Sequence, residues 1–104
     1  MSRRGAFTCL PPVQLLQETW EYEISLPRQV EALIRAGETV LAAGPEDYRK
    51  APGTRGFVLR LAEDGQLLQE LEIESPPVYE GMAVAEGRLY IVTQDGVVRC
   101  FAGR

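Results

Sequence analysis

Residues 81–101 read Gly81-Met-Ala-Val-Ala-Glu-Gly-Arg-Leu-Tyr-Ile-Val-Thr-Gln-Asp-Gly-Val-Val-Arg-Cys-Phe101. Three short apolar runs at 82–85, 88–93 and 97–101 are separated by Glu86-Gly87 and by Gln94-Asp95-Gly96. Short runs rich in β-branched and aromatic residues, joined by glycine-containing turns, are typical of antiparallel strands. The stretch therefore predicts a three-stranded antiparallel meander.

A similar pattern occurs earlier in the chain. Pro27 and Pro77, and likewise Gly37 and Gly87, lie 50 positions apart, and residues 31–43 match residues 81–93 as strand, turn, strand. Upstream, Leu15-Leu-Gln-Glu18 matches Leu67-Leu-Gln-Glu70 at a spacing of 52. A repeat of about 50 residues with four strands per unit is the period of a β-propeller blade. We therefore expect two blades.

The remaining strands follow from alternation and turn residues. Trp20, Tyr22, Ile24 and Leu26 alternate with polar residues, which predicts a strand over 20–26 that ends at Pro27. Further strands are expected at 30–36, 39–43, 56–62 and 67–73, the last two joined by an Asp64-Gly65 turn. The prediction is an all-β chain of two four-stranded antiparallel propeller blades, with the N-terminal strand as the outer strand of an incomplete blade. Its parts are an arm at 1–19 and one domain at 20–104, with repeat units at about 27–76 and 77–104 plus strand 20–26.

Composition excludes several kinds of chemistry. The 104 residues include no histidine and carry a net charge of −4. Histidine-dependent triads and histidine-ligated metals are therefore excluded, and a clustered basic surface for nucleic acid is not expected. No apolar run has the length of a membrane span, so no membrane partner is expected. Residues 1–12 begin like a signal peptide, but Pro11-Pro12 interrupt the apolar stretch, and we expect an irregular arm there.

Residues 57–70 and 81–101 resemble the PQQ-like (quinoprotein-type) repeat β-propellers, in particular their two C-terminal blades. The resemblance covers about residues 20–101, and it implies the propeller fold and an exported or periplasmic location, although the location is left open. Gln66 stands where that family has a turn lysine, and Gln69 stands where it has a docking tryptophan. The family's calcium ligands and catalytic aspartate come from other blades. No cofactor, metal ligand or catalytic residue is therefore carried over to this chain.

Two blades cannot surround an axis, so their faces and strand edges would be exposed. The sequence predicts a non-catalytic binding or assembly scaffold that completes a ring, either with about three or four copies of itself or with other propeller blades. Strand pairing between chains is expected to join two groups of residues, Trp20, Tyr22 and Ile24 in one chain and Val97, Arg99 and Phe101 in the other. The structural alternatives are a monomeric sandwich and a piece of a longer propeller. The functional alternative is a fragment or remnant of a quinoprotein-type oxidoreductase.

One loop has the residues of a ligand site. Its candidates are Glu46, Asp47, Tyr48, Arg49, Lys50 and Arg55. The cations would hold an anionic group and Tyr48 would stack on it, whereas the simpler interpretation is a solvated surface loop. Cys9 and Cys100 lie near opposite ends of the chain, and whether they pair is left open.

Overall fold

The computed structural model describes residues 16–51 and 53–102, and it forms two antiparallel sheets, with strand orders β1-β2-β3-β4 and β5-β6-β7. The strands are β1 (Ala32–Ala36), β2 (Thr39–Pro45), β3 (Gly56–Leu61), β4 (Leu67–Ile73), β5 (Pro77–Ala85), β6 (Arg88–Thr93) and β7 (Val98–Ala102), and a short 3-10 helix, η2 (Tyr48–Lys50), follows β2. The all-β prediction is confirmed. No helix among the described residues is long and apolar enough to cross a membrane.

The hairpin turns set the register of the repeat. In the first sheet Ala36 pairs with Thr39 around the turn, and in the second sheet Ala85 pairs with Arg88. These closing pairs lie 49 positions apart, so the two hairpins superimpose with a shift of 49 rather than the expected 50. Aligning the two glycines gives a shift that is one position too large, because they occupy different places in their turns. Gly37 is the first residue of its two-residue turn, and Gly87 is the second residue of its own. We call residues at corresponding positions of the two units repeat mates. In the strands up to β2 and β6 they lie 49 positions apart, and in β3 and β7 they are the residues that pair with corresponding positions of β2 and β6, as Val58 and Val98 do.

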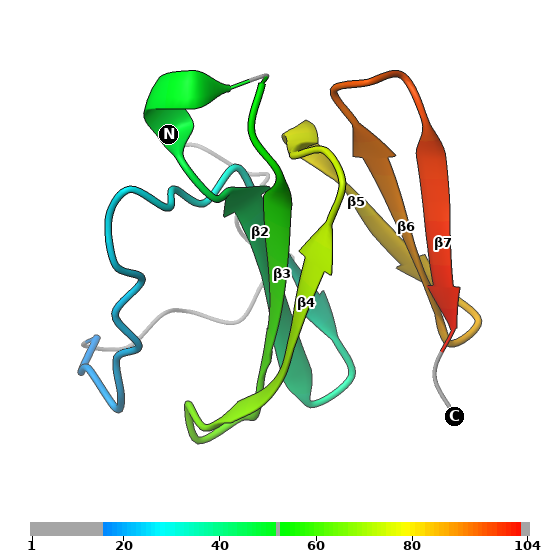
Figure 1. The fold of residues 1–104 in the computed structure, drawn as a ribbon. Helices are drawn as coiled ribbons and strands as arrows, with labels where there is room; N and C mark the ends of the chain where they lie inside the picture. The colour runs from blue at the N-terminus through cyan, green and yellow to red at the C-terminus, as the bar shows by residue number, and fades with distance from the viewer. Residues whose placement is uncertain (1–15, 52, 103–104) are drawn as a thin grey trace, which may run out of the picture.

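The core lies between the two sheets, which face each other in Figure 1. Leu41 and Val58 from the first sheet pack with Leu89 and Ile91 from the second, in a cluster that also contains Ala43 and Ile73. Burying these side chains removes apolar surface from water, which is the main favourable contribution to folding.

The two sheets contact each other through different faces. Leu89 and Ile91 are the repeat mates of Val40 and Ala42, and these two lie on the side of the first sheet that faces away from the core. We call the side of each sheet that carries these mates its front face, and the opposite side its back face. The back face of the first sheet thus packs on the front face of the second. We call this arrangement front-to-back stacking.

Residues 20–26 depart from the prediction. They are extended, but they form no strand and pair with no strand among the described residues. The alternation is correct in part, because Tyr22 and Ile24 are half-buried and Glu21 and Glu23 are exposed, whereas Leu26 is exposed. Alternation determines which side chains point inward, but a strand also needs a neighbouring edge with unpaired backbone groups. The second sheet accordingly has three strands instead of four.

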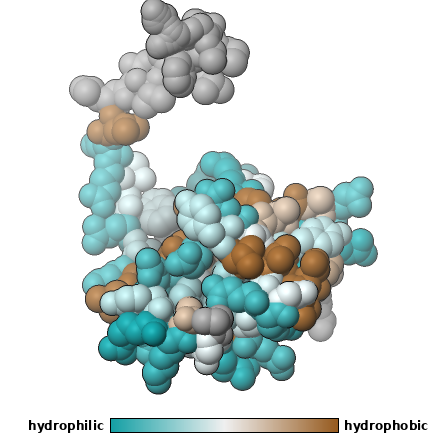
Figure 2. All heavy atoms as spheres, turned by 90° about the horizontal axis from the view of Figure 1, so that it is seen from above, coloured by the Kyte–Doolittle hydropathy of each residue, from teal (hydrophilic) through white to brown (hydrophobic). Residues whose placement is uncertain are grey.

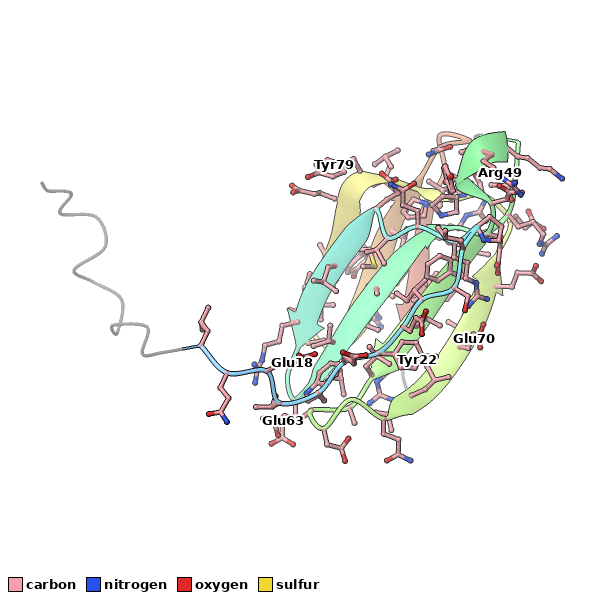
Figure 3. The ribbon with its side chains drawn as sticks, turned by 90° about the vertical axis from the view of Figure 1, so that its left-hand side faces the viewer. Glu18, Tyr22, Arg49, Glu63, Glu70 and Tyr79 are labelled. Carbon is pink, nitrogen blue, oxygen red and sulfur yellow. The ribbon has the colours of Figure 1, made fainter. Side chains whose placement is uncertain are left out.

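Side chains attach this segment to the front face of the first sheet, as Figure 3 shows. The indole Nε1 of Trp20 donates to the carbonyl oxygen of Glu63 at 2.8 Å, and its ring lies over Gly65. Gly65 has a φ of +91°, and an added Cβ would lie 2.7 Å from the Trp20 ring. Farther along, the backbone of Gln29 lies against Gly44 of β2, at a place where no side chain would fit. The segment therefore covers Phe57 and Leu59, which are fully buried on this face.

Candidate functional site

The charged loop after β2 lies at one end of the sheets, beside the segment that leads into β1. The backbone N–H of Tyr48 donates to the carbonyl oxygen of Pro27 at 2.9 Å. Asp47 caps η2 by accepting from the backbone N–H of Arg49 at 3.0 Å. The loop thus lies beside the exit of residues 20–26.

Four of its charged side chains have partners within the chain. Glu46 binds Arg28, Asp47 binds Arg49 and Arg55 binds Glu72. The Arg49 guanidinium holds the pKa of the Asp47 carboxyl below its usual range. An anionic ligand would have to compete with these carboxylates for the two arginines. Lys50 and Tyr48 are exposed on η2.

Arg28 is a residue that the sequence analysis missed. Its guanidinium donates to both oxygens of Glu46, at 2.8 and 3.2 Å, and to Glu70 of β4 at 2.5 Å. It also lies over the Phe57 ring, 4.7 Å from the centroid. The hydrogen bond that Arg28 donates to Glu46 raises the pKa of Arg28, and Glu70 adds to the shift against the opposing effect of burial. Arg28 therefore joins the segment, the loop and β4. The sequence held one signal for this role, a basic residue directly after Pro27 in a chain with a negative net charge.

Among the residues that the structure describes, none forms a layer over the back face of the second sheet. Tyr90, Val92 and Val98 lie on this face, and Cys100 lies beside them as an exposed thiol. Val98 is 66% exposed, whereas its repeat mate Val58, which faces the second sheet, is 2% exposed. Seen from the loop end, hydrophobic side chains gather on the side of the molecule where the second sheet lies (Figure 2). The back face thus contacts a neighbouring sheet in the first unit, whereas in the second unit it contacts no sheet among the described residues.

The front face of the first sheet is covered only in part. Leu33 of β1 is 67% exposed, whereas its repeat mate Met82 packs against the core. Within the described part of the chain, the segment covers the face over β3, and Leu33 stays exposed. The molecule therefore has two unlike apolar surfaces, one on each outer side.

The residues predicted to pair between chains lie far apart within one chain. Trp20, Tyr22 and Ile24 lie on the front side of the first sheet, and β7 lies on the other side of the molecule (Figure 1). Arg99 and Phe101 belong to β7, and Val97 comes just before it. β7 pairs with β6 along one edge, and no described strand pairs with its other edge. A single chain therefore does not bring the two groups together.

No described segment brings three or more potential metal ligands together. Searches against protein-family models, curated proteins and solved structures found no match to this chain. The geometry of the two sheets is therefore the basis for any functional conclusion.

Proposed function

We propose that this chain is a non-catalytic assembly scaffold whose two sheets act as propeller-like blades. Copies of the chain associate so that the back face of one second sheet packs on the front face of the next first sheet. The observation that carries the proposal is the contrast between repeat mates, Val98 at 66% exposed and Val58 at 2%. An exposed apolar face of this kind marks an interaction surface.

Two features make a second copy a suitable partner. Inside the chain, a back face already packs on a front face, so the chain carries both complementary surfaces. The free edge of β7 also presents unpaired backbone groups, which proteins usually cover or pair. Contacts between unlike surfaces produce a ring when the rotation closes. A ring of about six or eight blades, within the range of roughly four to eight that propellers have, would take three or four copies.

The mass of the full chain in solution tests the proposal. Light scattering should give a mass of about three or four chains at micromolar concentration, falling towards the monomer on dilution. A mass of one chain, unchanged over a wide range of concentrations, would overturn the proposal.

Two variants and a control locate the surfaces. Val98→Glu places a charge on the back face of the second sheet, and Leu33→Glu places one on the front face of the first. Both should be monomeric, while Tyr48→Glu, a change at an exposed aromatic residue on η2, should assemble normally.

Mixing the two variants makes the test stronger. Each one keeps the surface that the other has lost, so the mixture should stop at a pair of chains. If the Val98→Glu chain assembles as the unaltered chain does, the back face is not the contact.

A further inference from the structure

We propose that residues 20–26 of one copy form the fourth strand of the β5–β7 sheet of a second copy, in one fixed register. The inference rests on the proposed function, because it names the partner of the free β7 edge. It adds the order of the residue pairs across the junction between chains.

The first argument is the sequence of the segment in the register that the structure defines. With the shift of 49, Glu21-Tyr-Glu-Ile24 lies over Glu70-Leu-Glu-Ile73, and Pro27 lies over Pro76. Residues 70–73 belong to β4, the fourth strand of the first sheet. The segment thus carries the sequence pattern of a fourth strand, while the second sheet has only three.

The second argument is the placement of the segment. Tyr22 and Ile24 are the half-buried residues of the segment, and their repeat mates Leu71 and Ile73 are the residues of β4 that pack towards the second sheet. The segment therefore packs on the front face of the first sheet in the way that β4 packs on the front face of the second.

The prolines that follow the two stretches show the same relation. The carbonyl oxygen of Pro27 accepts from Tyr48 at 2.9 Å, after β2. The carbonyl oxygen of Pro76 accepts from Gln94 at 2.8 Å, after β6. Each proline is thus held by the loop that follows the second strand of the sheet it leads into. The segment thus lies where the outer strand of a preceding sheet would lie, although it belongs to neither of the two described sheets.

The partner must be a second copy. The segment and β7 lie on opposite sides of the first sheet in Figure 1. In Figure 3 the segment passes in front of the strands of the first sheet. Among the described residues, no strand pairs with residues 20–24, so their backbone groups are available. A second molecule can present its β7 edge from the open side without displacing the segment.

The register follows from the pairs already formed in the first sheet. There, Val58 lies opposite Leu71, and Leu59 lies opposite Glu70. The repeat mates of Val58 and Leu59 are Val98 and Arg99, because both pairs hold the same positions opposite β2 and β6. Across the junction, Tyr22 therefore lies opposite Val98, and Glu21 lies opposite Arg99.

The charges in this register are complementary. Glu21 is exposed in the single chain, and the Arg99 guanidinium donates to Asp95 of the β6–β7 turn at 2.6 Å and to Thr93 at 3.2 Å. Opposite charges that lie directly across two antiparallel strands stabilise the pairing, and like charges destabilise it. A slip of one residue would bring Arg99 opposite Tyr22 and would turn the apolar side chains of the segment to the wrong face.

Disulfide trapping between differently labelled chains tests the register. In a chain with Cys9→Ser and Cys100→Ser, we would introduce Tyr22→Cys into one sample and Val98→Cys into another. Directly opposite residues have Cα atoms about 4.5–5.5 Å apart, which suits a disulfide. Oxidation of the mixture should give a covalent dimer that neither sample gives alone. The matched control replaces Tyr22→Cys by Glu23→Cys, which points to the other face and should give little dimer.

The outcomes separate the two proposals. An assembled mass with no cross-link in the Tyr22→Cys and Val98→Cys mixture, or with equal cross-linking in the Glu23→Cys control, overturns the register and leaves the assembly proposal standing. A monomeric mass with no cross-link overturns both.

A charge reversal provides a second readout. Glu21→Arg should weaken association about fivefold, the upper end for a cross-strand pair, while Glu18→Arg, the same change outside the strand, should have less effect. Equal effects of the two variants would overturn the register.

Discussion

Replacing Arg28 tests how the N-terminal segment is held against the first sheet. Arg28→Met keeps much of the apolar stem and removes the guanidinium, which binds Glu46 and Glu70 and lies over Phe57. A stacked cation contributes about 0.5–2 kcal/mol, and each partly exposed ion pair contributes up to about 1 kcal/mol. The sum suggests a loss of roughly 2 kcal/mol in the free energy of unfolding.

For a domain of this size, 2 kcal/mol corresponds to a fall of roughly 8–16 °C in Tm. Thermal unfolding followed by circular dichroism measures this shift, with all variants at one protein concentration because association would change Tm. The matched control is Arg49→Met, whose side chain is 64% exposed and binds only Asp47 within its own turn. Its Tm should change little. If the two variants lose equal stability, the bridging role assigned to Arg28 is wrong.

Three further predictions concern stability and use urea unfolding. Ile91→Ala should cost about 2–5 kcal/mol, because the side chain is fully buried between the sheets; a cost below about 1 kcal/mol would contradict the described core. Gly65→Ala should cost at least about 1 kcal/mol, because its positive φ disfavours a side chain and the Trp20 ring occupies the space; unchanged stability would mean that the indole does not lie there. The Thr93 hydroxyl, followed by the Arg99 charge, holds the pKa of Asp95 below its usual range. The contribution of the Asp95 carboxylate to the free energy of unfolding is therefore complete above pH about 4 and is lost as pH falls through the lowered pKa. In Asp95→Asn, the urea midpoint should therefore depend less on pH between about pH 5 and pH 2 than it does in the unaltered chain.

Local sequence patterns predicted most of the strands and turns. The Asp64-Gly65 turn and the strand over residues 88–93 both correspond to the structure. Strand ends were less well predicted: β1 begins at Ala32 rather than residue 30, and β5 begins at Pro77 rather than residue 82. The register of β5 with β6 shifts between Pro77 and Met82, and an irregular pairing of this kind leaves no periodic signal in the sequence.

A change of one position in the alignment of the repeat changes which faces of the two sheets are inferred to contact each other. Aligning Gly37 with Gly87 gives a shift of 50, under which Leu41 matches Ile91. Under that shift, the two sheets would meet through identical faces. The pairing of the turns gives 49, under which Ala42 matches Ile91, and the sheets stack front to back. Because glycine is accepted at either position of such turns, identity at a glycine does not determine the register.

The candidate loop was recognised from its charges, but the partners of those charges were not. Arg55 binds Glu72 of β4, and Glu46 binds Arg28, contacts that join residues many positions apart. Composition shows that a loop is charged, whereas pairing depends on which strands the topology brings beside it. The same holds for residues 20–26, whose alternation was visible while the lack of a neighbouring strand was not.

Because of the front-to-back stacking, one outer side of the molecule is a front face and the other is a back face. Its two outer surfaces are different, so in the proposed assembly each contact joins a front face to a back face. In that assembly, each molecule added to a row would leave one end of each kind free, and growth would stop only if the rotation per molecule brought the last end back to the first. The angle between the two sheets would therefore decide between a closed particle and an open fibre, and small packing changes at Ile91 or Val58 would shift that choice.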